Sequence, residues 1–204
     1  MQVKAIRLNP KQPFQWSSGW LSPIYCDNRL TLSYPSVRSF VKQEIISVIH
    51  ERYGQTESIA GVATAGIPQA TLVADRLRLP LLYVRSASKG HGLRNRIEGQ
   101  VVEGQKVVVI EDLISTGKSS VEAADSLRAA GLDVLGVVAI FTYGFPQAEE
   151  AFQKADLSYC CLSDYDTMLE VATAQNYVPA EALDSLNRWR ENPAAWSPRT
   201  SVNP

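Results

Sequence analysis

The chain has 204 residues, of which 45% are hydrophobic and 20% charged, and a formal net charge of −1. This composition is typical of one globular domain that buries its own core, and the charge gives no general reason to expect a nucleic-acid partner. The cysteines Cys26, Cys160 and Cys161 lack a C-x-x-C spacing, which indicates reduced thiols. Because no apolar stretch reaches the ~20 residues that span a bilayer, and no signal-peptide core is evident, we expect a cytoplasmic protein with no membrane partner.

Helix and strand signals alternate along most of the chain. Residues 10–35 are rich in Pro, Ser, Trp and Tyr, which predicts turns and short strands rather than helix. Helices are then predicted at 36–53, 67–78, 118–130 and 146–154, and strands at 58–63, 79–85, 106–112, 133–141 and 157–162. The segment 164–190 is predicted to be helical, and the tail after Asn192 flexible. The alternation predicts the α/β class, with a mostly parallel central sheet flanked by helices.

A polar segment punctuated by glycines, SASKGHGLRNRIEG (86–99), separates two of the predicted strands. It has no core-facing periodicity, so we expect a mobile loop. Its basic side chains alone indicate only a solvated surface loop.

The stretch VVVIEDLISTGKSS (107–120) carries the strongest chemical signal. Its Gly-Lys-Ser turn matches the second half of the nucleotide-binding pattern G-x-x-x-x-G-K-[ST]. The first glycine of that pattern would fall at position 112, which is an aspartate, where a carboxylate would face the triphosphate. A P-loop kinase is therefore disfavoured. An ordinary strand–turn–helix explains the glycine, but it does not explain two adjacent acids at the end of an apolar strand.

A sugar phosphate accounts for the whole stretch. Ligands of open α/β sheets bind beyond the carboxyl ends of the strands, and a helix start rich in hydroxyls and free N–H groups binds a phosphate group. The residues that provide such a phosphate site are Ser115, Thr116, Gly117 and Ser119. One turn earlier, Glu111 and Asp112 can accept hydrogen bonds from a ribose diol. The acids therefore precede the phosphate site along the stretch. This order predicts a sugar phosphate whose hydroxyls lie at the acidic pair and whose 5′-phosphate lies at the helix start.

The same stretch resembles the phosphoribosyl pyrophosphate (PRPP) motif of type I phosphoribosyltransferases. Other segments narrow the resemblance to the orotate phosphoribosyltransferase family; they are FQWSSGWLSPIYCDNRLTLSYP (14–35), GVATAGIP (61–68), YVRSASKGHG (83–92), FTYGFPQAEEAF (141–152) and DYDTMLEVA (164–172). The resemblance implies one domain of the type I phosphoribosyltransferase fold over 1–190. It also implies a small N-terminal hood formed largely by 1–35, followed by a flexible tail at 191–204.

The resemblance further implies an activity and an assembly. The phosphoribosyl group of PRPP is transferred to orotate, giving orotidine 5′-monophosphate and pyrophosphate for UMP biosynthesis. Mg²⁺ is the implied cofactor, held mainly by substrate oxygens with Asp112 as a direct or water-mediated ligand. The implied assembly is a homodimer with shared active sites, in which the loop of one subunit closes over the site of its neighbour.

Individual roles follow from the same resemblance. The implied catalytic residues are Lys89, His91 and Asp112; Lys89 and His91 would stabilise or protonate the departing pyrophosphate. The implied PRPP-binding residues are Arg85, Lys89, His91, Glu111, Asp112, Leu113, Ile114, Ser115, Thr116, Gly117, Lys118 and Ser119. The implied orotate-binding residues are Ser115, Tyr25, Cys26 and Arg29. For Arg29, a structural salt bridge is an equal alternative.

Some features leave alternatives open. Lys118 stands where many relatives have glycine, and it either adds a phosphate contact or points to solvent. Residues 142–144 lack the arginine that some relatives use for the orotate carboxylate, so that contact is unassigned. A purine-base transferase is disfavoured by the Ser-Gly-x-x-Ser-Pro-Ile-Tyr segment. The remaining alternative is a PRPP-sensing regulator that binds nucleic acid, which the net charge does not favour.

Overall fold

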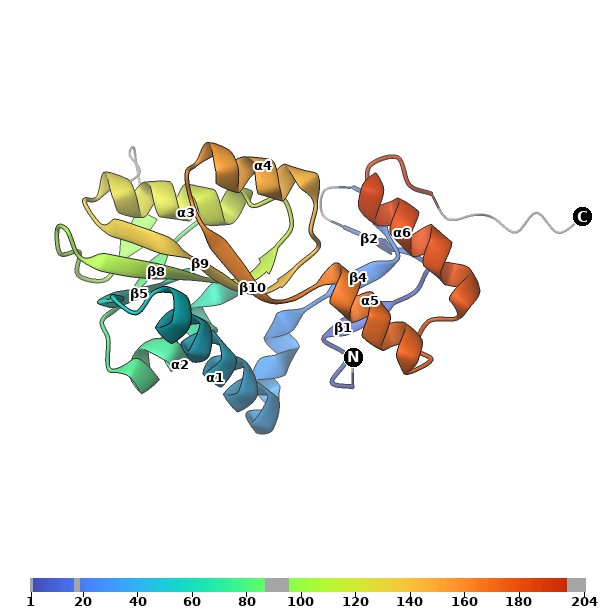
Figure 1. The fold of residues 1–204 in the computed structure, drawn as a ribbon, viewed down its shortest axis with the longest axis horizontal. Coiled ribbons are helices and arrows are strands. Elements are labelled where there is room, and N and C mark those ends of the chain that lie inside the picture. Colours follow the sequence, from blue (N-terminus) through green and yellow to red (C-terminus); the bar gives the residue numbers. More distant parts are fainter. Residues whose placement is uncertain (1, 17–18, 87–95, 198–204) are drawn as a thin grey trace, which may run out of the picture.

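A six-stranded sheet forms the centre of the computed structural model, which describes residues 2–16, 19–86 and 96–197 (Figure 1). The strand order is β10-β9-β8-β5-β6-β7. The strands are β5 (Ser58–Val62), β6 (Leu81–Val84), β7 (Ile97–Glu98), β8 (Lys106–Ile114), β9 (Asp133–Thr142) and β10 (Tyr159–Asp164). All pairings are parallel except that of β6 with β7. The predicted α/β class and mostly parallel sheet are confirmed.

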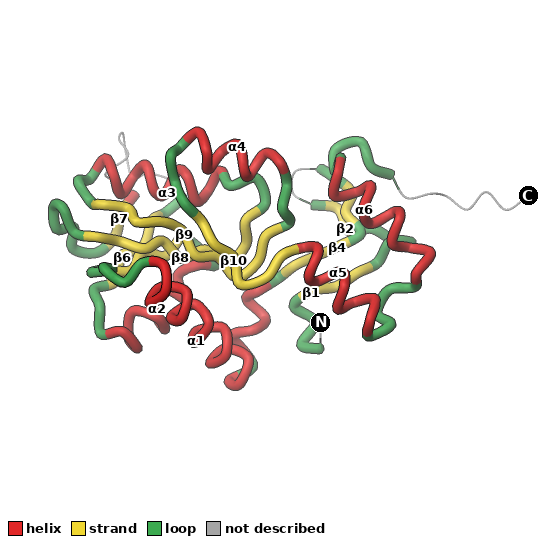
Figure 2. Tube along the Cα trace, viewed as in Figure 1, coloured by secondary structure: helices red, strands yellow, loops and turns green. Residues whose placement is uncertain are grey.

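Helices cover both faces of this sheet, as Figure 2 shows. The first pair, α1 (Pro35–Arg52) and α2 (Gly66–Leu77), packs on one face, and α3 (Lys118–Ala129) and α4 (Pro146–Lys154) pack on the other. Successive residues of β8 alternate between the two cores, with Val107 and Val109 facing α3 and Val108 and Ile110 facing α1 and α2. This burial on both sides explains the continuous apolar run from Val107 to Ile110.

A second lobe contains the N-terminal strands and the last two helices (Figure 1). Its antiparallel pairs are β1 (Ile6–Leu8) with β4 (Ile24–Cys26), and β2 (Phe14–Gln15) with β3 (Leu21–Ser22). The helices α5 (Tyr165–Ala174) and α6 (Leu183–Glu191) pack with these strands in a third core, rich in aromatic residues. The buried Trp189 indole donates a hydrogen bond to the Leu21 carbonyl at 3.2 Å. The lobe therefore joins residues from both ends of the chain.

Three segments differ from the sequence-based expectations. Residues 28–33, predicted to be turns or strands, form a 3₁₀ helix, η1 (Asn28–Ser33), whose start is capped by the Asp27 carboxylate. Residues 97–98, predicted to lie in a loop, form the edge strand β7 because they pair with Tyr83 and Val84. The segment predicted as one helical stretch is divided into α5 and α6, with a short 3₁₀ helix, η3 (Ala180–Ala182), before α6.

Part of the tail packs on the second lobe. The Trp196 indole lies against the third core and donates a hydrogen bond to the Ser185 carbonyl at 3.0 Å. Residues 198–204 lie outside the described residues, so the predicted flexibility of the tail stays a prediction there. Within the described ranges, no helix is both long enough and apolar enough to cross a lipid bilayer.

Candidate functional site

The acidic pair lies at the carboxyl end of β8, where the strand extends beyond one of its neighbours. The register with β5 ends at Ile110, whereas the register with β9 continues to Ile114. Gly117 then adopts a left-handed conformation with φ of 77°, and α3 begins at the next residue. The order of strand end, loop and helix start therefore occurs as the sequence predicted.

The two carboxylates have different surroundings. Glu111 is only 4% exposed, and its oxygens accept hydrogen bonds from the Ser119 and Ser120 hydroxyls at 3.0 and 3.2 Å. It also accepts one from the Asp112 amide at 3.0 Å. Asp112 is less buried. Glu111 thus connects the strand end to the first turn of α3, which fixes the loop between them.

Burial makes this pair weakly acidic. Desolvation, together with the negative charge of Asp112, raises the pKa of Glu111 to about 8. Desolvation also raises the pKa of Asp112 above its ordinary value, an effect partly opposed by hydrogen bonding and by the Arg29 charge. A partner that donates hydrogen bonds to this pair would favour its ionised form, and the hydroxyls of a diol are such donors.

A cavity of about 630 Å³ lies beside the loop. Its walls come from the second lobe and from the end of the sheet; the lining residues are Gln15, Trp16, Trp20, Tyr25, Cys26, Leu113, Ser115, Thr116 and Tyr143. The predicted base-binding residues Tyr25, Cys26 and Ser115 are thus brought together. Burial raises the pKa of the Cys26 thiol to about 12, and it also raises that of Tyr143, so both groups are neutral near pH 7.

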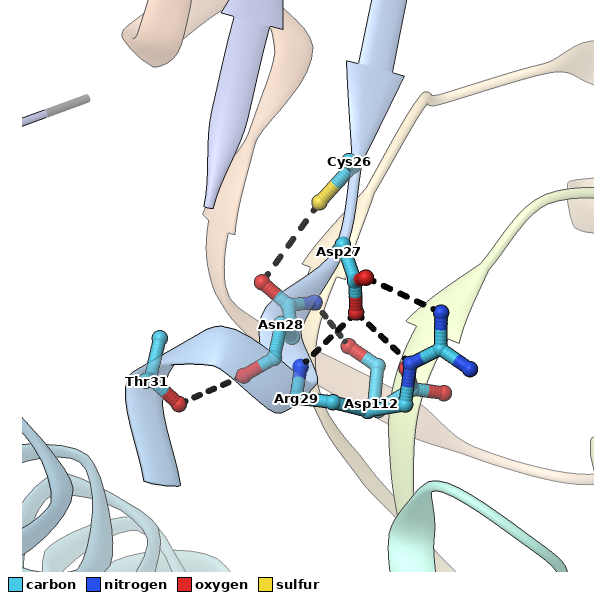
Figure 3. Close-up of polar contacts among 6 residues, drawn as sticks. All are labelled: Cys26, Asp27, Asn28, Arg29, Thr31 and Asp112. Atoms are coloured by element: carbon cyan, nitrogen blue, oxygen red, sulfur yellow. Dashed lines mark hydrogen bonds and ion pairs between the residues drawn. The ribbon is translucent and has the colours of Figure 1, made fainter. Parts of the chain in front are cut away.

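Arg29 is not among the residues lining this cavity. Its guanidinium forms two hydrogen bonds with the Asp27 carboxylate, at 2.6 and 3.0 Å, as Figure 3 shows. Its side chain is 60% exposed. Of the two alternatives for this residue, the structure contains the salt bridge.

Next to this pair, Asn28 contacts the acidic strand end directly. Its amide nitrogen donates a hydrogen bond to the Asp112 carbonyl at 2.7 Å, and its amide oxygen lies 3.4 Å from the Cys26 sulfur (Figure 3). The sequence contains no signal for this contact, because the two partners lie 84 positions apart.

Basic side chains lie at the carboxyl end of β6. Arg85 forms an ion pair with Glu98 at 3.0 Å, and Arg96 forms one with Glu122 of α3 at 2.9 Å. Together with Ser119, the two arginines line a small cavity of about 60 Å³. Arg85 therefore lies on the same side of the sheet as the phosphate loop. The predicted catalytic residues Lys89 and His91 lie outside the described residues.

Lys118 points to the surface. Its side chain is 81% exposed and its ammonium group lies 3.9 Å from the Glu122 carboxylate, one helical turn later. The Lys118 side chain therefore faces solvent here, and its contact with a phosphate group stays a prediction.

Sequence reasoning missed several residues of the site. Gln15, Trp16 and Tyr143 line the cavity, and Ser120 binds Glu111. The sequence shows that the segment 14–35 is rich in aromatic residues, but it does not show which of them face the cavity. Groups of three or more His, Cys, Asp or Glu side chains that could hold a metal are absent from the described ranges.

Comparisons with known proteins agree with this geometry. The phosphoribosyl transferase domain family matches residues 40–167. Orotate phosphoribosyltransferase from Bacillus subtilis is 57% identical over 193 residues, covering 95% of this chain and 89% of the relative. The enzyme of the same name from Bacteroides fragilis is 55% identical over 196 residues, covering 96% and 92% of the two chains.

A solved structure supports the same family. The crystal structure of orotate phosphoribosyltransferase from Aeropyrum pernix superposes with a TM-score of 0.75 at 29% identity, covering 87% of this chain and 96% of that one. The sequence relatives extend over nearly the whole chain and the structural relative superposes over most of it, which confirms the resemblance. The chain belongs to the orotate phosphoribosyltransferase family of phosphoribosyltransferase enzymes.

Proposed function

We propose that the protein transfers the phosphoribosyl group of PRPP to orotate, forming orotidine 5′-monophosphate and pyrophosphate in cytoplasmic UMP biosynthesis. The observation that carries this proposal is the junction of two sites at the end of β8. The buried Glu111, the half-buried Asp112 and the loop at 115–119 lie beside an aromatic cavity of about 630 Å³. A sugar phosphate in the first site would direct its anomeric carbon toward a flat base in the second.

The phosphate loop would bind the 5′-phosphate of PRPP. Residues 115–119 turn through Gly117 into the start of α3, where main-chain N–H groups without helical partners and the helix dipole favour an anion. Glu111 holds this loop through the Ser119 and Ser120 hydroxyls. Asp112 would accept hydrogen bonds from the ribose 2′- and 3′-hydroxyls.

The cavity would bind orotate between its aromatic walls. Tyr25 and Cys26 lie at one side of the cavity and Ser115 at the other, so backbone groups and hydroxyls can reach the edges of the ring. The lining side chains exclude water from the bond that breaks. This exclusion strengthens every electrostatic interaction in the site.

Pyrophosphate would leave on the side of Arg85. Cleavage of the bond between C1′ and oxygen builds positive charge on the ribose and negative charge on pyrophosphate, so positioning and charge stabilisation supply most of the catalysis. The planar fork of Arg85 suits a bidentate contact with phosphate oxygens. Lys89 and His91 of a neighbouring subunit would complete this side in a homodimer with shared sites.

Mg²⁺ would bind mainly through pyrophosphate and ribose oxygens. The residues present fit such an ion, since Asp112 is a hard oxygen donor beside the predicted diol site and retains more exposure than Glu111. When bound, Mg²⁺ supplies charge neutralisation for pyrophosphate. Asp112 would hold it directly or through water.

An ultraviolet absorbance assay tests the proposal. Purified protein is mixed with PRPP, Mg²⁺ and one base at a time, with orotate as the test and uracil, adenine and hypoxanthine as parallel bases. Of the four bases, we expect turnover only with orotate. We expect this turnover to be lost when Mg²⁺ is chelated. Turnover with a purine instead would contradict the assignment of the cavity while retaining the PRPP site. Binding of PRPP without turnover of any base would favour a PRPP sensor.

A further inference from the structure

Asn28 joins the second lobe to the catalytic end of the sheet. It is 6% exposed and begins η1, directly after the strand β4. Its amide nitrogen donates to the carbonyl of Asp112 at 2.7 Å, a short distance for such a bond. The Thr31 hydroxyl binds the Asn28 carbonyl at 2.6 Å and so fixes the first turn of η1 (Figure 3).

The main chain at Asp112 lacks a strand partner on one side. The β5 register ends at Gly61 and Ile110, while β9 accompanies β8 to Ile114. The Asp112 carbonyl is partly buried, and leaving a carbonyl without a hydrogen bond in such a place is costly. The Asn28 side chain supplies that bond where the sheet no longer does, so it fixes the peptide that carries the Asp112 carboxylate.

The other end of the same amide contacts the base cavity. The Cys26 thiol donates to the Asn28 oxygen at 3.4 Å, and Cys26 lines the cavity. One rigid amide group thus fixes both the wall of the cavity and the acidic strand end. Rotation of the Asn28 amide would break both hydrogen bonds.

We propose that Asn28 is a positioning residue that sets the distance and orientation between the base cavity and the ribose-binding Asp112. The proposal rests on the proposed function. Asn28 is not among the residues that line the cavity, so it would act through Asp112 and Cys26. Alignment of the two reactants within a fraction of an ångström is worth large factors in rate, so its loss should slow the transfer step itself.

The test compares Asn28→Ala with a matched control, Ser58→Ala. The Ser58 hydroxyl is also buried and also donates to a main-chain carbonyl of β8, that of Lys106, at the opposite end of the strand. Both variants lose one buried side-chain bond to the same strand. The measurements are kcat and KM for both substrates, the dissociation constant of PRPP by calorimetry, and the thermal midpoint. Asn28→Asp, which keeps the volume and removes the donor, replaces Asn28→Ala if that variant does not fold.

For Asn28→Ala we expect kcat to fall roughly 10- to 100-fold and the PRPP dissociation constant to rise. Ser58→Ala should lower the thermal midpoint while kcat stays within about twofold of the wild type. Equal loss of thermal midpoint in both variants, with kcat and PRPP affinity retained in both, would overturn the proposal.

Measurements on the wild-type protein distinguish a failure of the proposed function from a failure of the positioning role of Asn28. Failure of the wild type to use orotate would refute the proposed function, and PRPP calorimetry would then decide the role of Asn28. In that case, an unchanged PRPP affinity in Asn28→Ala, or no PRPP binding by the wild type, would overturn the positioning role.

Discussion

Adjacent acids at the end of β8 have separate tasks that their positions in the sequence do not distinguish. Glu111 faces inward and holds the start of α3, whereas Asp112 lies nearer the surface beside Asn28. Three hydrogen bonds do not remove the cost of burying the Glu111 charge, as its raised pKa shows. Glu111 therefore keeps its proton well above the usual range of a glutamate, and hydrogen-bond donors from a ligand would favour its ionised form.

Substitution of Glu111 by Gln should change how stability depends on pH. An unfolded glutamate releases its proton near 4.5, whereas folded Glu111 retains it to about 8. The folded state thus binds more protons between these values, and the free energy of unfolding falls as pH rises through this range, by at most about 1.4 kcal/mol per pH unit. In Glu111→Gln this decline should largely disappear. Urea unfolding at intervals from pH 5 to pH 8 measures it.

Glu150→Gln is the matched control for this experiment. Glu150 is an exposed carboxylate on α4 that pairs with Lys154. Its substitution should leave the pH slope of the wild type in place. The same slope in Glu111→Gln as in the wild type would show that Glu111 is ionised in the folded protein throughout this range.

At the scale of elements, the approach of α2 to β8 is the tightest constraint near the site. A Cβ atom on Gly66, the first residue of α2, would lie 2.5 Å from the Ile110 carbonyl oxygen. Ile110 directly precedes the acidic pair. Glycine at this position therefore lets the helix start contact the strand where the strand leaves its β5 partner.

Gly66→Ala should destabilise the protein by about 1–3 kcal/mol, because neither backbone can move without disturbing a buried sheet. The matched control is Gly54→Ala after α1, where a Cβ would meet the His50 carbonyl at 3.4 Å, an ordinary contact. That variant should lie within about 0.5 kcal/mol of the wild type. Urea unfolding gives both free energies from the midpoints, provided that the unfolding free energy has the same dependence on urea concentration in each variant. Equal stability of the two variants would refute the steric argument.

Most regular elements could be predicted from the sequence because their hydrophobic patterns extend over many residues. The helices α1 to α4 and the strand β8 lie within two residues of their predicted bounds. The elements β7 and η1 were not predicted because neither has an extended hydrophobic pattern: β7 depends on its pairing with Tyr83 and Val84, and η1 begins at the Asp27 cap. The position of Asp112 followed from the rule for strand ends, whereas its contact with Asn28 is purely tertiary.

On the scale of the whole molecule, the two lobes meet at the site. Figure 1 shows the sheet with its four helices beside the smaller lobe, and the cavity takes its walls from both. The predicted hood is therefore more than residues 1–35, since α5 and α6 complete its core. The core of this lobe depends on the last helix as much as on the first strands.

The predicted homodimer can be tested by mixing inactive subunits. Lys89→Ala and Asp112→Asn proteins should each lose most activity. After unfolding and refolding together, half of the dimers should be mixed, and each mixed dimer should contain one intact site. We expect about one quarter of the wild-type activity to return.

Affinity tags of two kinds, one on each variant, verify that mixed dimers form. If they form and activity stays at the sum of the two parents, each loop serves its own subunit and the shared-site assembly is wrong.

The bond from Trp189 to Leu21 also has a consequence for synthesis. Its partners lie 168 positions apart, so the hood cannot close until nearly the whole chain has left the ribosome. The strands and helices that carry the proposed sugar-phosphate site are complete well before then. Trp16, which lines the proposed base cavity, lies 5.6 Å from Trp189 between ring centres and reaches its final packing only at that late stage. A growing chain would therefore acquire the two proposed half-sites at different times, the sugar-phosphate half first and the base half last.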